Sequence, residues 1–510
     1  MVKEIFYAHN NENERSARNI TRSSAIFYFK NCEKVKTELH YLNYWSIKRG
    51  LTDVSRRVTF RDMAGIALLT LNDYVTSSGA QKVDVSALLS QNHINAEDGS
   101  IEVEFFSESN LFIAYPAIVI RYVGDNWHTF AHSSQRILSP ESGDDGSLEA
   151  GISNEGNITI QAGKTVRPFV IIHNGPNPMA QKPIALKVTS HDGECLSFNT
   201  NAISWEPYQT RLIYLDDYIN LENFLQGKFG TFNLIFHSNG IFPRLIGGCE
   251  KNGAWSIDHT NFSDTSGPAA LDVIPVSPTN PDKSLVFCLP NNVLKNWKCF
   301  TDIYPTFPKG ETYEVQISSI SNKNQRKVLA IEKLEHKGSR SFKRIILQNS
   351  DVCENNTIEL AFKNAQSLPR RFHIGVHYQI GDGLPGFLTD GPLPYTTAGI
   401  RTRWFPVFEI DKCENYLMMA HRALGDEHAC DIEFDVELYN SFGDAALTSK
   451  IKLKKYSQIC LPIEEIFQEA PKYLNNQPGW VYMISSGKQR SVVHYASKFG
   501  EKSIGVCHAF

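Results

Sequence analysis

The sequence predicts an all-β protein built from about four tandem immunoglobulin-like β-sandwich units, with short crossover helices. Short segments alternate apolar and polar residues: in SIEVEFF, the apolar Ile101, Val103 and Phe105 are separated by glutamates, which is the period of a half-buried strand. Gly, Asp and Asn separate these segments, as turns with positive φ require. About seven such segments recur in each ~100 residues, a spacing typical of an immunoglobulin-like sandwich.

The same landmarks recur three times along the chain. A turn glycine precedes a final histidine by 65 to 67 residues in three places, which are Gly65 and His132, Gly193 and His259, and Gly443 and His508. A repeat at a fixed period indicates that one supersecondary unit is used several times. We therefore expect the three glycines in equivalent turns and the three histidines in equivalent last strands.

The repeat and the connecting segments place the unit boundaries. After a polar tail (1–19), we expect unit one at 20–140, unit two at 165–270, unit three at 284–395 and unit four at 396–510. The segment SPESGDDGSLEAGISNEGN between units one and two is rich in Ser, Gly and acidic residues, which favours a solvated connector. The segment KVDVSA of unit one is interpreted as a strand, and the alternative for KVDVSALL is one turn of helix that crosses between two sheets.

Unit three departs from the pattern of the others. SLVFCLP, YEVQISSIS and NTIELAFKN predict strands, but the turn glycine and the final histidine are absent from the expected places. Its last part, GDGLPGFLTDGPLPYTTAG, predicts a long loop because it is heavy in Gly and Pro. Unit four returns to the alternating pattern in IEFDVELYN and ends in the strand SIGVCHAF.

Composition excludes several classes of protein. The net charge of −4 gives no sign of phosphate-driven binding to nucleic acid. No segment approaches the ~18 apolar residues of a membrane helix, and the N-terminus lacks the apolar segment of a signal peptide. The ten cysteines are scattered without a C-x-x-C pair, so we expect reduced thiols in a cytoplasmic protein without a cofactor. A homo-oligomer stays open.

The histidines do not predict a metal site. His128 and His132 have the spacing of a helical zinc pair, as do His373 and His377. On a strand, however, residues i and i+4 lie roughly 13 Å apart, too far to share one metal ion. We expect no metal. The repeated histidines His132, His259 and His508 are interpreted as caps of strand-end carbonyl groups, with a site between two units as the alternative.

The best candidates for ligand binding lie in unit three and its Gly/Pro loop. They are basic, acidic or aromatic residues on one predicted strand, its neighbours and the loop: Arg340, Arg344, Arg370, Arg371, His373, His377, Asp382, Phe387 and Asp390. Forked guanidinium donors suit carboxylate or phosphate groups. We therefore expect an anionic small molecule, a saccharide or a protein as partner. The alternatives are an edge strand that its charges keep from aggregating and, for the loop, a connector between units.

Catalytic motifs are missing. The sequence contains no G-x-S-x-G, no P-loop, no G-x-G-x-x-G and no H-E-x-x-H. We therefore expect a non-catalytic binding or assembly protein rather than an enzyme. Two alternatives remain: an enzyme acting on carbohydrate or nucleotide-sugar with its site between units, and a structural subunit of a shell or filament.

Overall fold

The computed structural model describes residues 19–76, 79–139, 151–262, 274–275, 283–290, 297–304, 312–335, 342–347, 356–362, 373–391, 401–422, 430–485 and 491–509. Of the residues in these ranges, 61% lie in β-strands and 8% in helices, so the predicted all-β class is confirmed. The strands form four successive pairs of antiparallel sheets, and each pair contains the same eight-strand pattern. We call these pairs units one to four.

The eight main strands of each unit can be numbered in chain order. One sheet then has the order first-sixth-third-fourth, and the other has the order fifth-second-seventh-eighth. In an immunoglobulin domain the first two strands share a sheet, whereas in each unit of this protein they lie in opposite sheets. In unit one the first sheet is β1 (Arg22–Lys30), β6 (Asp98–Phe106), β3 (Ser55–Arg61) and β4 (Ala67–Tyr74), and the second is β5 (Ala80–Asp84), β2 (Val35–Leu42), β7 (Ile118–Gly124) and β8 (Trp127–His132).

The other three units repeat this order. Unit two has β10 (Gly151–Gln161), β17 (Phe229–Ser238), β13 (Ala185–Ser190) and β14 (Cys195–Asn199), then β16 (Thr210–Tyr214), β11 (Val166–His173), β19 (Ile246–Lys251) and β20 (Ala254–His259). Unit three has β23 (Lys283–Leu289), β28 (Thr357–Phe362), β25 (Thr312–Ile320) and β26 (Arg326–Glu335), then β27 (Lys343–Leu347), β24 (Trp297–Ile303), β29 (Ile374–Ile380) and β30 (Gly386–Asp390). Unit four has β31 (Arg401–Val407), β36 (Gly479–Ser485), β33 (Ile432–Tyr439) and β34 (Leu447–Leu453), then β35 (Gln458–Pro462), β32 (Glu414–His421), β37 (Ser491–Lys498) and β38 (Ile504–His508).

Short elements complete the units. The small strands are β9 (Arg136–Ile137), β12 (Met179–Lys182), β15 (Ile203–Trp205), β18 (Ile241–Phe242), β21 (Asn261–Phe262) and β22 (Ile274–Pro275). The helices are η1 (Trp45–Arg49), α1 (Val85–Gln91), η3 (Leu215–Asp217), α2 (Leu221–Leu225), α3 (Ile463–Ile466) and α4 (Ala470–Leu474). The segment KVDVSALL contains both the predicted strand and the alternative helical turn, because β5 ends at Asp84 and α1 begins at Val85. The Asp84 carboxylate accepts from the Ala87 backbone N–H at the start of α1. None of the helices in the described ranges is long and apolar enough to cross a membrane.

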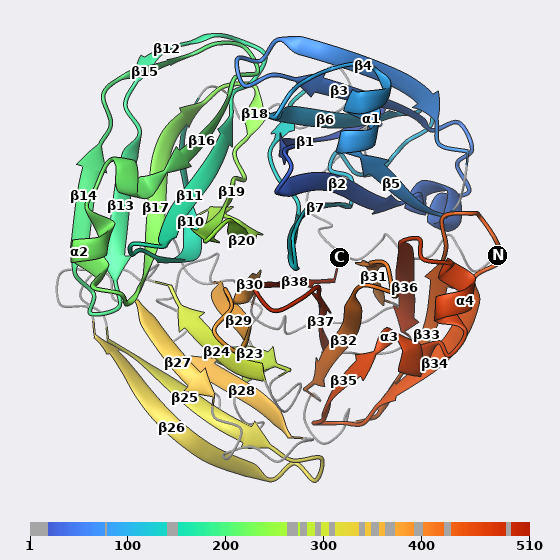
Figure 1. Ribbon diagram of the computed structural model, residues 1–510. Helices are drawn as coiled ribbons and strands as arrows, with labels where there is room; N and C mark the ends of the chain where they lie inside the picture. Colours follow the sequence, from blue (N-terminus) through green and yellow to red (C-terminus); the bar gives the residue numbers. More distant parts are fainter. Residues whose placement is uncertain are drawn as a thin grey trace.

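The four units form a closed ring (Figure 1). Their last strands lie at the centre, where β8 lies beside β20, β20 beside β30, β30 beside β38, and β38 beside β8 again. The second sheet of each unit packs its outer face on the preceding unit. Tyr416 and Met418 of unit four join the apolar core of unit three, and Val119 and Phe130 of unit one join that of unit four. The first and last units of the chain therefore close the ring.

Two segments that composition suggested to be loops are strands. Residues 151–157 of the predicted connector belong to β10, which pairs with β17. Several polar side chains of β10 are buried with partners from other segments, as when the Thr260 hydroxyl donates to the Glu155 carboxylate. The predicted Gly/Pro loop contains β30, which pairs with β29. Strand β29 therefore lies between β24 and β30 rather than at an edge.

The turn glycines lie where their spacing predicted. Gly65, Gly193 and Gly443 each follow the third strand of a unit, and their φ values are 93°, 85° and 79°. In unit three, Asn324 takes this place with a φ of 60°. Asn tolerates the left-handed region better than most residues, so unit three keeps the turn without the glycine.

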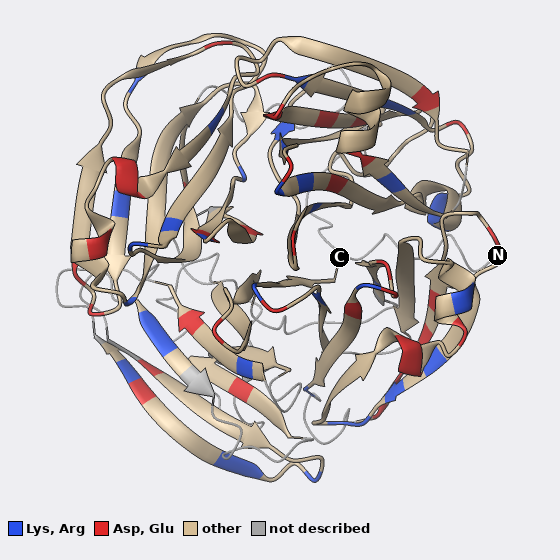
Figure 2. Ribbon diagram, viewed as in Figure 1, with Lys and Arg blue, Asp and Glu red and all other residues tan. Residues whose placement is uncertain are grey.

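Charged residues of both signs alternate around the ring. Figure 2 shows Lys and Arg interspersed with Asp and Glu over all four units, with no sector of a single sign. Several of these charges lie between units, where they are buried. Glu102 and Glu104 of β6, which the alternation placed on a solvent face, are buried and both pair with Arg22.

Candidate functional site

Three histidines from three units meet at the centre of the ring. The last strands of units one, two and four end in His132, His259 and His508, and potential ligand atoms of the three side chains lie within 4.8 Å of one another. The ring centroid of His132 lies 4.6 Å from that of His259 and 4.2 Å from that of His508. In unit three, Thr389 occupies the position that corresponds to the histidines of the other units, because it follows Phe387 by two residues as His132 follows Phe130. We call the three histidines the axial cluster.

Backbone carbonyl groups orient two of these imidazole rings. Nδ1 of His259 lies 3.0 Å from the carbonyl oxygen of Thr260, and Nδ1 of His508 lies 3.1 Å from that of Thr389. A carbonyl oxygen only accepts hydrogen bonds, so the proton of each neutral ring is on Nδ1 and the lone pair is on Nε2. Nε2 of His259 is buried and has no hydrogen-bond partner among the described residues. Nδ1 of His132 lies 2.7 Å from Sγ of Cys507.

Burial keeps the axial cluster uncharged. It lowers the pKa of His132 and of His259 well below the usual value and that of His508 to about 4, because a charged ring would lose its hydration there. Neighbouring positive charge, including Arg244, acts in the same direction. His132 and His259 are buried, and His508 is half-buried. The cluster therefore reaches solvent on the side of His508.

Arg244 is a cation beside this cluster. It lies between β18 and β19, is half-buried, and makes no ion pair or hydrogen bond with a described residue. Its guanidinium carbon lies 5.8 Å from the ring centroid of Phe242. Burial raises the pKa of the Asp258 carboxyl, and Arg244 acts electrostatically in the opposite direction, without a direct ion pair between the two. A partly desolvated cation that makes no direct ion pair favours an anionic partner.

Two of the predicted ligand residues, Arg344 and His377, contact a buried carboxylate. Nε and Nη2 of Arg344 lie 2.6 Å from the two carboxylate oxygens of Asp302, and Nε2 of His377 lies 2.8 Å from Oδ2. The Thr159 hydroxyl of unit two donates to the same carboxylate over 2.6 Å. Asp302 is fully buried; burial alone would raise its pKa, but His377 and Arg344 outweigh it and lower the pKa. This group joins units two and three.

The other predicted ligand residues are distributed between the axis, the surface and the undescribed segments. Asp390 accepts from Nε2 of His494 over 3.1 Å and acts electrostatically on His508. Phe387 is buried against the ring of His377. His373 is half-buried and acts electrostatically on His259, whereas Asp382 is exposed. Arg340, Arg370 and Arg371 lie outside the described residues.

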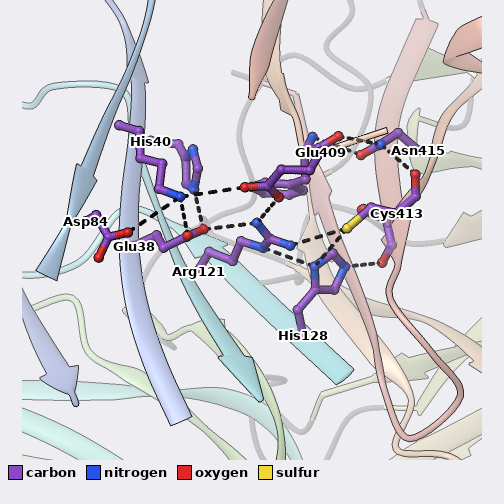
Figure 3. A network of polar contacts seen from close by, with 11 residues as sticks. Glu38, His40, Asp84, Arg121, His128, Glu409, Cys413 and Asn415 are labelled. Carbon is purple, nitrogen blue, oxygen red and sulfur yellow. Dashed lines mark hydrogen bonds and ion pairs between the residues drawn. The ribbon is translucent and has the colours of Figure 1, made fainter. Parts of the chain in front are cut away.

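A second polar network lies where unit one meets unit four (Figure 3). Nη1 of Arg121 lies 3.0 Å from Glu38 and 2.6 Å from Glu409 of unit four, and its Nη2 donates to Sγ of Cys413 over 3.3 Å. Lys82 contacts both glutamates. Burial alone would raise the pKa of Glu38, but Arg121 and the other neighbours lower it well below its usual value. The two cations and the two carboxylates balance each other, so the network stabilises the closure of the ring.

Cys413 in this network does not have the properties of a nucleophile. Its sulfur lies 4.0 Å from Nδ1 of His128, but that nitrogen already accepts from Nε of Arg121 over 3.1 Å. Burial raises the pKa of the Cys413 thiol to about 11. The thiolate, which is the reactive form, is therefore scarce at neutral pH.

Comparison with protein-family models and with curated proteins finds no match to this chain. The site therefore stands on its own geometry. Sequence reasoning had singled out the axial histidines but missed Arg244 and Thr389. No sequence pattern marked Arg244, because its proximity to the histidines depends on how the units pack. Thr389 lay in a segment interpreted as a loop.

Proposed function

We propose that this chain is a non-catalytic binding protein that recognises a small anionic ligand at the axial cluster, with Arg244 as the anchor. The half-buried guanidinium of Arg244, which has no ion-pair partner among the described residues, is the observation that carries the proposal. A carboxylate or phosphate group on the ligand makes a direct ion pair with this guanidinium through charge-assisted hydrogen bonds. Acidic saccharides are the class of ligand we favour.

The contacts of Arg344 and His377, two of the predicted anion-binding residues, support this location. An anion at Arg344 or His377 has to displace the Asp302 carboxylate, which is already held by three side chains. At Arg244, an incoming anion has no directly bound carboxylate of the described residues to displace. Because the anchor is a charge near the surface, binding is expected to weaken as salt increases.

Two further proposals concern the context of the protein. We infer that the four units arose as repeats of one eight-strand sandwich, because their strand orders are the same.

We also infer a cytoplasmic location. The nine cysteines in the described ranges are all unpaired, which is usual where thiols are kept reduced.

Binding to defined anions tests the proposed function. Inorganic phosphate, citrate and glucuronate are titrated against the wild-type chain and the Arg244→Gln variant, with glucose as the neutral comparison. At least one of the three anions is expected to bind, and Arg244→Gln is expected to weaken that binding at least tenfold. Arg211→Gln is the matched control, because Arg211 already donates to the Ser204 carbonyl oxygen. Equal binding by wild type and Arg244→Gln contradicts the proposal.

A further inference from the structure

We propose that His132, His259 and His508 bind one divalent transition-metal ion, of which zinc is the first candidate. The three side chains come from three different units and converge with their potential ligand atoms within 4.8 Å. Three histidines around one ion form a known type of zinc site, and imidazole also suits copper, nickel and iron. This proposal replaces the expectation from the sequence that the chain holds no metal.

The tautomers of the rings support the assignment. Histidines that bind a metal ion through one nitrogen usually donate the other N–H to a carbonyl or carboxylate group, which fixes the ring. His259 and His508 show this arrangement through Thr260 and Thr389, respectively. Their Nε2 lone pairs are therefore the atoms left for a ligand bond.

The buried Nε2 of His259 is the second, independent observation. A buried acceptor without a donor is unfavourable, and this atom has no hydrogen-bond partner among the described residues. A metal ion accepts the lone pair that no hydrogen-bond donor satisfies.

The geometry needs only a small side-chain adjustment. Nitrogen ligands about 2.0–2.1 Å from a tetrahedral ion lie roughly 3.3 Å from one another, and the potential ligand atoms already lie within 4.8 Å of one another. His508 lies on β38 and is half-buried, whereas His132 and His259 are buried. We expect the His508 side chain to make most of this adjustment.

Three histidine ligands leave a fourth coordination position. Water or an anion takes this position, because the three ligands are neutral and the ion keeps its full positive charge. Arg244 adds a further positive charge nearby. An anionic fourth ligand rests on the proposed function, whereas the metal site itself does not.

Metal binding by the full chain tests the proposal. The protein is freed of metal with a chelator and then titrated with Co²⁺ and with Zn²⁺, with elemental analysis for stoichiometry and visible absorption for Co²⁺ geometry. We expect one ion per chain and a Co²⁺ spectrum of a four-coordinate site. Wild-type protein that binds neither ion at micromolar concentration overturns the proposal.

Matched variants locate the site. His508→Gln and His259→Gln are each expected to weaken Co²⁺ binding at least 100-fold. Of the two, His508→Gln is expected to destabilise the fold less, because His508 is half-buried and His259 is buried. His173→Gln is the control, since His173 is a buried strand-end histidine outside the axial cluster. Unchanged Co²⁺ affinity in a folded His508→Gln protein overturns the proposal. Arg244→Gln is expected to retain the metal even if it loses anion binding, so the two proposals can fail separately.

Discussion

Single residues show how one structural requirement can be met by different amino acids. Units one and two close the turn after their third strand with the same two backbone hydrogen bonds, around Gly65 and Gly193. Unit three makes the same pair, from Ser321 N–H to the Gln325 carbonyl and from Asn324 N–H to the Ser321 carbonyl. The requirement is a left-handed backbone rather than a glycine, and Asn meets it at low cost.

Buried uncharged histidines make stability depend on pH. Burial lowers the pKa of His173 to about 3, while an unfolded chain keeps a value near 6.5. Between these values the unfolded state binds a proton that the folded state does not, so stability decreases as pH falls below about 6.5. His173→Gln is expected to reduce the slope between roughly pH 4 and 6 by about 1.4 kcal/mol per pH unit. Urea unfolding at several pH values measures this slope, and an unchanged slope contradicts the assignment.

At the scale of elements, the polar faces of the sheets join neighbouring units. The outer face of the second sheet in unit three carries Asp302, Arg344 and His377, and it packs on unit two. The Arg344 guanidinium carbon lies 3.3 Å from the ring centroid of Phe229, and Thr159 donates to Asp302. The polar face of this sheet therefore packs on the neighbouring unit instead of facing water.

Removing one member of this buried group is expected to be costly. Asp302→Asn keeps the size of the side chain but leaves the Arg344 charge without its counterion, so we expect a loss of about 3–5 kcal/mol in the free energy of unfolding. Glu433→Gln is the control, because its pair with Lys450 is exposed and exposed pairs contribute less than about 1 kcal/mol. Chemical denaturation compares the two variants. Similar losses in both contradict the role of the buried group.

At the scale of the whole molecule, the ring closes between units that are far apart in the sequence. Arg121 of unit one and Glu409 of unit four make this contact, and apolar side chains of both units share one core. Because the ring is closed, the second sheet of unit one also packs on a neighbour, which is unit four. Closure also holds β8 beside β38, which brings His132 to His508.

Weakening the closure is expected to expose Cys413. Arg121→Met removes the charge that holds Glu38 and Glu409 together, so units one and four should separate more often. The rate at which a thiol reagent labels Cys413 is then expected to rise at least tenfold, while Cys299 in unit three stays protected. Cys430 is exposed and serves as the reference thiol. Arg56→Met is the control, because Arg56 pairs with Asp73 within unit one; equal protection of Cys413 in both variants contradicts the role of Arg121.

The sequence by itself determined the local features of this protein. Alternating residues predicted the strands, and the spacing from glycine to histidine predicted matching turns and matching last strands, because these depend on neighbouring residues in the chain. The strand β10 was missed because its polar side chains resemble a connector until Thr260 and other distant partners satisfy them. Tertiary structure alone decided that the glutamates of β6 are buried, that Arg344 contacts Asp302, and that three distant histidines share one site. The physical reason is that burial and ligand geometry depend on which units pack together, and the periodicity of one strand is the same whether its polar face meets water or another unit.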